Sequence, residues 1–171
     1  MHIDLVGPTT TKDLKGERYF MLLVDDYTRM TAVFFLKNKS EAFENFKIYE
    51  EMVENEMDSR IKCLRFDNGG EFTSKEFMDY CSSHGIKKKL SVARTPQQNE
   101  VVERKNMTVQ EIAQTMIMDS KLIDIFWTQA VHTTIHIQNR AMLKNNTDKT
   151  PYELWKGKPA NVKHFRVFGS K

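Results

Sequence analysis

The sequence is poor in several features that would define its class. Of its 171 residues, 2 are cysteines, 4 are prolines and 7 are glycines, which argues against both a disulfide scaffold and a disordered chain. Its longest apolar runs, 19–24 and 32–36, are far shorter than the roughly 20 residues that cross a bilayer. The N-terminus lacks a secretory signal pattern, and the net charge of +3 permits a polyanionic partner without requiring one. We therefore expect one folded intracellular domain with no membrane partner.

Hydrophobic periodicity predicts a mixture of strands and helices. Apolar and β-branched stretches predict strands at 3–6, 19–24, 30–36, 61–66 and 86–92. Spacing of three and four predicts helices at 40–57, at 74–84, across 102–117 after a polar loop at 95–99, from Trp127 to about Arg140, and from a capping box at Thr150–Glu153. Three hairpin-like strands followed by a crossover helix predict an α/β domain with a five-stranded mixed sheet flanked by helices.

Three carboxylates fall where such a sheet opens crevices. Asp4 lies in the first strand, Asp67 ends the fourth, and Glu103 lies near the start of the long helix. Together they would repel one another unless a cation neutralised them, and oxygen ligands select Mg²⁺ or Mn²⁺. Two such ions about 4 Å apart support in-line attack on a phosphodiester. These residues are therefore our candidate metal ligands and catalytic residues.

Each carboxylate also has a purely structural interpretation. Asp4 could be a strand-edge charge, Asp67 a turn former, and Glu103 a first-turn acid favoured by the helix dipole. Asp25 and Asp26 form the most visible acidic pair, but neighbours on a strand face opposite sides. We interpret that pair as turn and scaffold residues.

A polar loop bordered by basic residues lies close to the proposed metal site. Its cations and amides could contact phosphates or base edges, so we expect DNA binding that is mostly backbone-directed and sensitive to salt. The candidate DNA contacts are Asn68, Arg94, Gln97, Gln98, Asn99, Arg104 and Lys105.

Several motifs in a fixed order resemble a known family. They are His2–Pro8, Asp25–Arg29, Arg65–Phe72, Thr95–Asn106, Asn139-Arg140, Thr150–Trp155 and Val167–Gly169. In this order they resemble the retroviral-type integrase catalytic core, in its copia-type LTR-retrotransposon form. Asp67 and Glu103 have 35 residues between them (68 to 102), the separation typical of that family's Asp-Asp-Glu triad.

The resemblance implies a ribonuclease-H-like fold and a polynucleotidyl transferase of a Pol polyprotein. It implies that Asp4, Asp67 and Glu103 hold two Mg²⁺ or Mn²⁺ ions, and that element DNA ends are processed and joined to target DNA. It also implies a homo-oligomer that acts in the nucleus and passes through a cytoplasmic particle beforehand. Residues 1–171 would be one catalytic core with a C-terminal extension from about 141, without the zinc-binding N-terminal or DNA-binding C-terminal domains.

Glu100 departs from the pattern, because the copia-type motif has glycine there. An added carboxylate one turn before Glu103 would change the charge beside the proposed ligands. A first alternative is therefore a truncated or decayed core that binds DNA or assembles without turnover, and a Glu100→Gly substitution would separate an impaired enzyme from such a module. A second alternative is a metal-dependent nuclease of the same fold, which uses water as the nucleophile and leaves nicked products.

Overall fold

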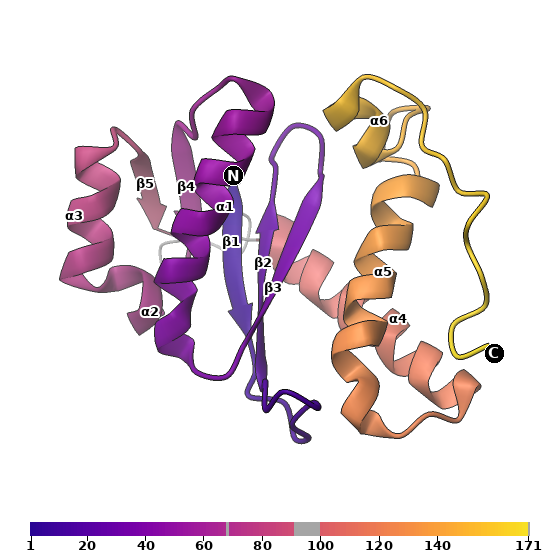
Figure 1. Cartoon of the computed structure of the whole chain (residues 1–171). Helices are drawn as coiled ribbons and strands as arrows, with labels where there is room; N and C mark the ends of the chain where they lie inside the picture. The colour runs from indigo at the N-terminus through magenta and orange to yellow at the C-terminus, as the bar shows by residue number, and fades with distance from the viewer. Residues whose placement is uncertain (68, 91–99, 171) are drawn as a thin grey trace.

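The computed structural model describes residues 1–67, 69–90 and 100–170, and its centre is one five-stranded sheet. The strands are β1 (His2–Val6), β2 (Tyr19–Val24), β3 (Thr31–Leu36), β4 (Cys63–Phe66) and β5 (Lys87–Leu90). Their order is β3-β2-β1-β4-β5, with β1, β2 and β3 antiparallel and β4 and β5 parallel to β1 (Figure 1). The predicted mixed sheet of five strands is confirmed.

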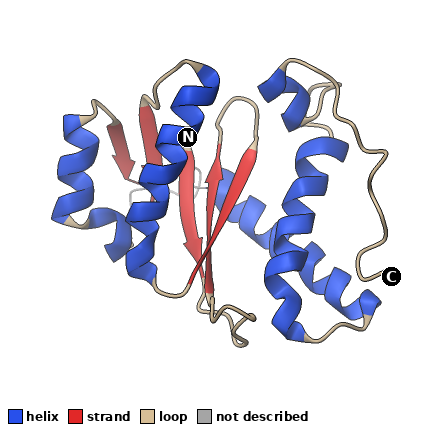
Figure 2. Cartoon of the chain, viewed as in Figure 1, coloured by secondary structure: helices blue, strands red, loops and turns tan. Residues whose placement is uncertain are grey.

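Helices cover both faces of the sheet, as Figure 2 shows. They are η1 (Lys39–Glu41), α1 (Ala42–Met57), α2 (Gly70–Thr73), α3 (Lys75–Ser83), α4 (Glu100–Ser120), η3 (Asp124–Phe126), α5 (Trp127–Ala141) and α6 (Pro151–Lys156). Alternate residues of β2 divide the core: Met21 and Leu23 pack with α1 and α3, whereas Phe20 and Leu22 pack with α4 and α5. In the part of the chain described, no helix is long and apolar enough to span a bilayer.

Local capping explains several of the helix ends. Ser74 caps α3 by accepting a hydrogen bond from the Phe77 N–H at 3.3 Å, and Gly85 follows that helix with φ +70°. Thr150 and Glu153 form the predicted capping box of α6. The predicted capping box is confirmed, and α3 lies within the range 74–84 expected for a helix.

Two boundaries around β4 differ from the sequence-based expectation. The strand begins at Cys63 rather than Ile61, because the Ile61 N–H donates to Glu54 Oε1 at 2.7 Å instead of joining the sheet. The short helix α2 follows β4 and was not expected, since a glycine-led segment of four residues carries no helical periodicity.

Buried aromatic rings anchor the segment around α2. Phe66, Phe72 and Phe77 are fully buried, and their ring centroids lie 5.6 to 6.0 Å apart. Phe66 precedes Asp67 and Phe72 follows Glu71, so both ends of this acidic segment are fixed to the core.

The helix α5 packs against the edge of the sheet that is formed by β3. Asn139 donates from Nδ2 to the Thr31 carbonyl at 2.7 Å and accepts the Thr31 N–H on Oδ1 at 3.1 Å. Both groups are buried, and the bonds pair part of the free edge of β3. This pairing fixes the C-terminal half of α5 beside the turn between β2 and β3.

Candidate functional site

Two of the three candidate carboxylates hold matching positions on neighbouring strands. β1 and β4 run parallel with His2 opposite Arg65. Side chains alternate along a strand with a period of two, so this register continues to Asp4 on β1 and to Asp67, directly after β4, on the same face. Asp4 also lies opposite Leu22 of β2, whose side chain belongs to the core beneath α4 and α5. Both positions therefore face the side of the sheet covered by α4.

Asp4 is half-buried, and both of its oxygens are hydrogen-bonded. The Leu5 N–H donates to Oδ1 at 2.9 Å, and the Asn106 side-chain amide donates to Oδ2. Burial, followed by the negative charges of Asp67, Glu103 and Glu71, raises the pKa of Asp4 to about 7. The carboxyl is thus oriented by neutral donors, and no lysine or arginine in the described part of the chain forms an ion pair with it.

The helix α4 carries Glu103 toward Asp4. Val102, Val109 and Ala113 are buried against the sheet and hold this helix in place, whereas Glu103 on the adjoining stripe is exposed. Asn106 lies one turn after Glu103, is 5% exposed, and makes the bond to Asp4. The long helix thereby supplies both a third carboxylate and a positioning amide.

Glu71 is a fourth carboxylate of this site, and the sequence analysis missed it as a candidate. It acts on the Asp4 pKa together with Asp67 and Glu103. Its carboxylate and Asp67 Oδ1 both lie close to Gly69, where an added Cβ would meet each of them at about 3 Å. The sequence carried no signal for this role, because it depends on how α2 packs beside Asp67 and Asp4.

The donor set matches a hard divalent cation. Asp4 and Asp67 make no ion pair with any described residue, and Glu71 has only Lys39 Nζ at 4.0 Å. Carboxylate oxygens around a half-buried acid favour Mg²⁺ or Mn²⁺ over zinc. Among the described residues no three His, Cys, Asp or Glu side chains lie at metal-holding distance as they stand. The charges of Asp67, Glu103 and Glu71 therefore act on Asp4, but in this arrangement the carboxylates do not lie close enough together to hold a metal ion.

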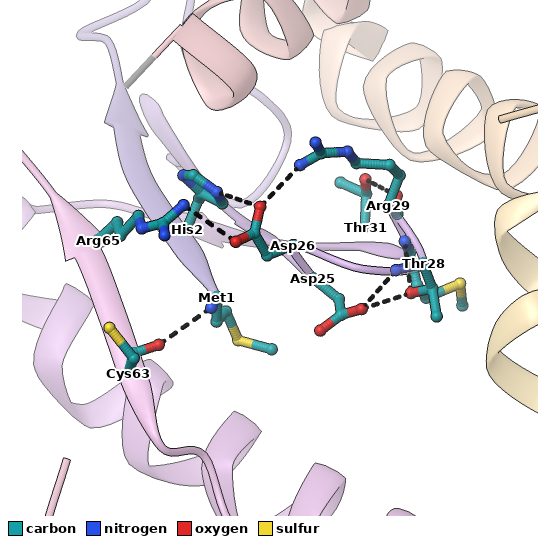
Figure 3. A network of polar contacts seen from close by, with 10 residues as sticks. Met1, His2, Asp25, Asp26, Thr28, Arg29, Thr31, Cys63 and Arg65 are labelled. Carbon is teal, nitrogen blue, oxygen red and sulfur yellow. Dashed lines mark hydrogen bonds and ion pairs between the residues drawn. The ribbon is translucent and has the colours of Figure 1, made fainter. Parts of the chain in front are cut away.

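Asp25 and Asp26 belong to a separate network beside the site (Figure 3). Asp26 accepts hydrogen bonds from Arg29 and Arg65 at 3.1 and 3.0 Å and contacts His2 Nε2 at 3.0 Å. Asp25 accepts from the Thr28 N–H and hydroxyl at 2.7 and 2.8 Å. These contacts close the turn between β2 and β3 and tie it to β1 and β4, which agrees with the scaffold role that we expected.

Two of the seven candidate DNA contacts, Arg104 and Lys105, fall within the described residues. Asn68, Arg94, Gln97, Gln98 and Asn99 lie outside the described residues. Arg104 is exposed on α4, and Lys105 is half-buried, with burial lowering its pKa to about 8. At about 100° per residue, Arg104 and Lys105 lie on a different side of α4 from Glu103.

The pKa of Asp4 leads to a stability prediction for the metal-free protein. Because the folded-state pKa of about 7 exceeds the ordinary value of 3.8, the contribution of Asp4 is fully present below about pH 4 and is lost as the pH rises through 7. An Asp4→Asn variant has no such titration. Relative to the parent, its free energy of unfolding should therefore rise between pH 4 and 7, by at most about 4 kcal/mol.

Urea unfolding at several pH values in EDTA measures this difference. Asp79→Asn, an exposed carboxylate on α3, is the matched control and should show no such trend. A difference between Asp4→Asn and the parent that stays constant from pH 4 to 8 would contradict the destabilising effect of the half-buried Asp4 charge.

Comparison with known proteins agrees with the geometry. Residues 1–96, which include Asp4 and Asp67, match the model of the integrase core domain. The chain is 38% identical over its whole length to the retrovirus-related Pol polyprotein from transposon TNT 1-94 of Nicotiana tabacum. It is 34% and 32% identical over 89% of its length to those from transposons RE2 and RE1 of Arabidopsis thaliana. It spans 13% of the first relative and 10% of the other two.

Solved structures share the fold at low sequence identity. A chain of the simian T-cell lymphotropic virus intasome, in complex with a PP2A regulatory subunit, superposes with a TM-score of 0.71 at 18% identity, over 99% of this chain and 57% of that one. The HTLV-2 integrase catalytic core domain in complex with magnesium, in its dimeric form, gives 0.63 at 18% identity, over 90% and 93% of the two chains. The sheet is thus ribonuclease-H-like, and the chain belongs to the integrase core domain family, in the form carried by Pol polyproteins of copia-type retrotransposons.

Proposed function

We propose that this chain is the catalytic core of a divalent-metal-dependent DNA integrase, which joins the 3′ end of element DNA to a target phosphodiester. The observation that carries the proposal is the parallel register that sets Asp4 beside Asp67, with Glu103 of α4 near enough to raise the Asp4 pKa. Such a group of acids has no obvious structural use, because it destabilises the metal-free fold.

In this proposal Asp4, Asp67 and Glu103 hold two Mg²⁺ or Mn²⁺ ions, and Glu71 adds negative charge beside them. When bound, the ions would activate the attacking oxygen and stabilise the leaving oxygen of an in-line displacement. The chain itself fixes its ligands. The Leu5 N–H and the Asn106 amide orient the two oxygens of Asp4, and the helix stripe of Val102 and Val109 holds Glu103 at the site.

The partners proposed for this chain are DNA and further copies of itself. The two solved structures named above are an intasome chain and a core domain with magnesium in its dimeric form. By the same reasoning, Asn68, Arg94, Gln97, Gln98, Asn99, Arg104 and Lys105 remain the proposed DNA contacts, two Mg²⁺ or Mn²⁺ ions the proposed cofactor, and the nucleus the proposed place of action.

A joining assay tests the proposal. Labelled element-end DNA and target DNA are incubated with the chain and Mg²⁺ or Mn²⁺, and strand-transfer products are resolved from nicked DNA. We expect joined products that disappear in EDTA. Nicked DNA without joining would support the nuclease instead. A correctly folded chain that takes up no Mn²⁺ in a calorimetric titration would contradict the proposed metal chemistry.

The departure at position 100 requires its own comparison. The helix α4 begins at Glu100, so this residue stands about one turn before Glu103. If the parent chain is inactive, a Glu100→Gly variant with metal-dependent joining would mark an impaired enzyme. Continued inactivity with an intact fold would favour a module that binds DNA without turnover.

A further inference from the structure

A cleft lined by cations opens at the turn between β2 and β3 and reaches the first turns of α4, which also carry Glu103. Its volume is about 620 Å³, within the range of small-molecule sites. The walls come from that turn, the first turns of α4, the end of α5 and the loop leading to α6. Glu103 is not among its lining residues.

The charge of this cleft has one sign. Of the residues whose side chains the structure describes, Arg29, Arg104, Lys105 and Lys144 line it, and no aspartate or glutamate does. Arg29 is shared with Asp26, which accepts from its Nη1 at 3.1 Å, whereas the Lys144 ammonium lies 4.7 Å from the centroid of the exposed Tyr27 ring. Four cations around one hollow favour a ligand with more than one negative charge, and phosphate groups are the common biological case.

The loop that carries Lys144 is built into the fold. The Lys144 N–H donates to the Lys149 carbonyl at 2.9 Å, and the Thr147 N–H and hydroxyl donate to the Lys144 carbonyl at 3.1 and 2.8 Å. These hydrogen bonds hold the backbone of Lys144 in place at the cleft. Because the loop is already ordered without a ligand, binding costs less conformational entropy.

The side chain of Gln138 indicates which other groups the ligand carries. It lines the same cleft, is 4% exposed, and its Oε1 is buried with no hydrogen-bond partner among the described residues. A buried acceptor needs a donor, which a phosphate diester lacks and which a sugar hydroxyl or a base amine supplies. Val24, Val101 and Met142 add apolar wall suited to a base or sugar.

We propose that this cleft binds a nucleotide, with its phosphates against Arg29, Lys105 and Lys144 and its sugar or base donating to Gln138. The nucleotide is either a free nucleoside triphosphate or one unit of a nucleic-acid strand, since both present the same groups. Arg104 and Lys105 flank Glu103 on α4 and are among the DNA contacts proposed above, so the choice of a nucleic-acid strand rests on the proposed function, whereas binding itself needs no metal ion.

Binding is measured by calorimetry in EDTA, so that a failed metal site leaves the result unaffected. The probes are ATP, a short single-stranded thymidine oligonucleotide and inorganic triphosphate. We expect Lys144→Glu to weaken binding of ATP or the oligonucleotide by at least about tenfold, because one charge-assisted contact is replaced by repulsion. Lys75→Glu, the same charge change at an exposed position on α3 across the sheet, should leave affinity within about twofold.

Gln138→Met tests the second contact. Removing an unpartnered amide costs the fold little, so the variant should unfold like the parent. It should weaken nucleotide binding but not that of inorganic triphosphate. Binding of ATP identifies a free nucleotide, and binding of the oligonucleotide alone identifies a strand. The proposal is overturned if neither binds at millimolar concentration, if Lys75→Glu weakens binding as much as Lys144→Glu, or if inorganic triphosphate binds as tightly as the nucleotide.

Discussion

An Asp67→Asn variant is expected to lose metal-dependent DNA joining by at least about a thousandfold. The carboxylate is a proposed metal ligand set beside Asp4 by the parallel register of β1 and β4. Replacing it with a neutral amide removes charge from the reacting centre, and a loss of about 4 kcal/mol of transition-state stabilisation corresponds to a thousandfold in rate. The measurement is the initial rate of strand transfer with Mg²⁺ and with Mn²⁺.

The Asp67→Asn variant must be as well folded as the parent for the loss of joining to be assigned to the carboxylate. Asp67 is exposed, and its Oδ1 accepts a hydrogen bond from the Gly69 N–H at 3.0 Å. The side-chain oxygen of an asparagine can accept the same bond. Less repulsion on Asp4 should leave the metal-free protein as stable as the parent at pH 8, or more stable. Asp79→Asn again serves as the control that should retain full activity. Joining within tenfold of the parent by Asp67→Asn would remove this residue from the catalytic set.

A Phe77→Ala variant is expected to lose about 3–5 kcal/mol of stability, the largest structural effect that we predict. Phe77 is fully buried, and its ring centroid lies 5.5 to 5.6 Å from those of Phe43, Phe46, Phe66 and Phe72. Alanine would leave a cavity among these rings that a packed interior closes only in part. Urea unfolding at neutral pH measures the loss, and thermal unfolding should shift by about 10 °C.

Two further variants show whether packing is the cause. Phe77→Leu refills most of the volume and should lose less than half as much stability as alanine. Met118→Ala, at a side chain 70% exposed on α4, should change stability by less than about 0.5 kcal/mol. Because Phe66 and Phe72 flank the segment with Asp67 and Glu71, Phe77→Ala should also weaken Mn²⁺ binding. A stability loss below about 1 kcal/mol would mean that the aromatic cluster is not the support of this segment.

Strands and helices with strong local signals were predictable. Tyr19–Val24 is bounded by turns and alternates between two buried faces, and its predicted range equals β2. Thr150, Pro151 and Glu153 define the start of α6 by capping alone. Ile61 was assigned to β4 wrongly, because its N–H is taken by Glu54, a contact seven residues away that no alternation pattern reports.

Some residues of the candidate site could likewise be proposed from the sequence, and others could not. Asp4, Asp67 and Glu103 could be proposed from element ends and from the order of motifs, and that proposal still awaits its test. Glu71 and Asn106 could not, because their relevance lies in contacts with Asp4 that depend on α2 and α4 packing onto the sheet. Arg29 and Lys144, on segments remote from one another in the chain, meet only at the cleft.

The sequence by itself determined the family, the order of strands and helices, and which face of each element is apolar, because these follow from residue type at periods of two and 3.6. Only the tertiary structure decided that β4 lies parallel to β1 with His2 opposite Arg65, that Asp4 is half-buried with a raised pKa, and that cations from three segments line one cleft. The physical reason is that register and burial arise from packing between segments far apart in the chain, for which local periodicity carries no information.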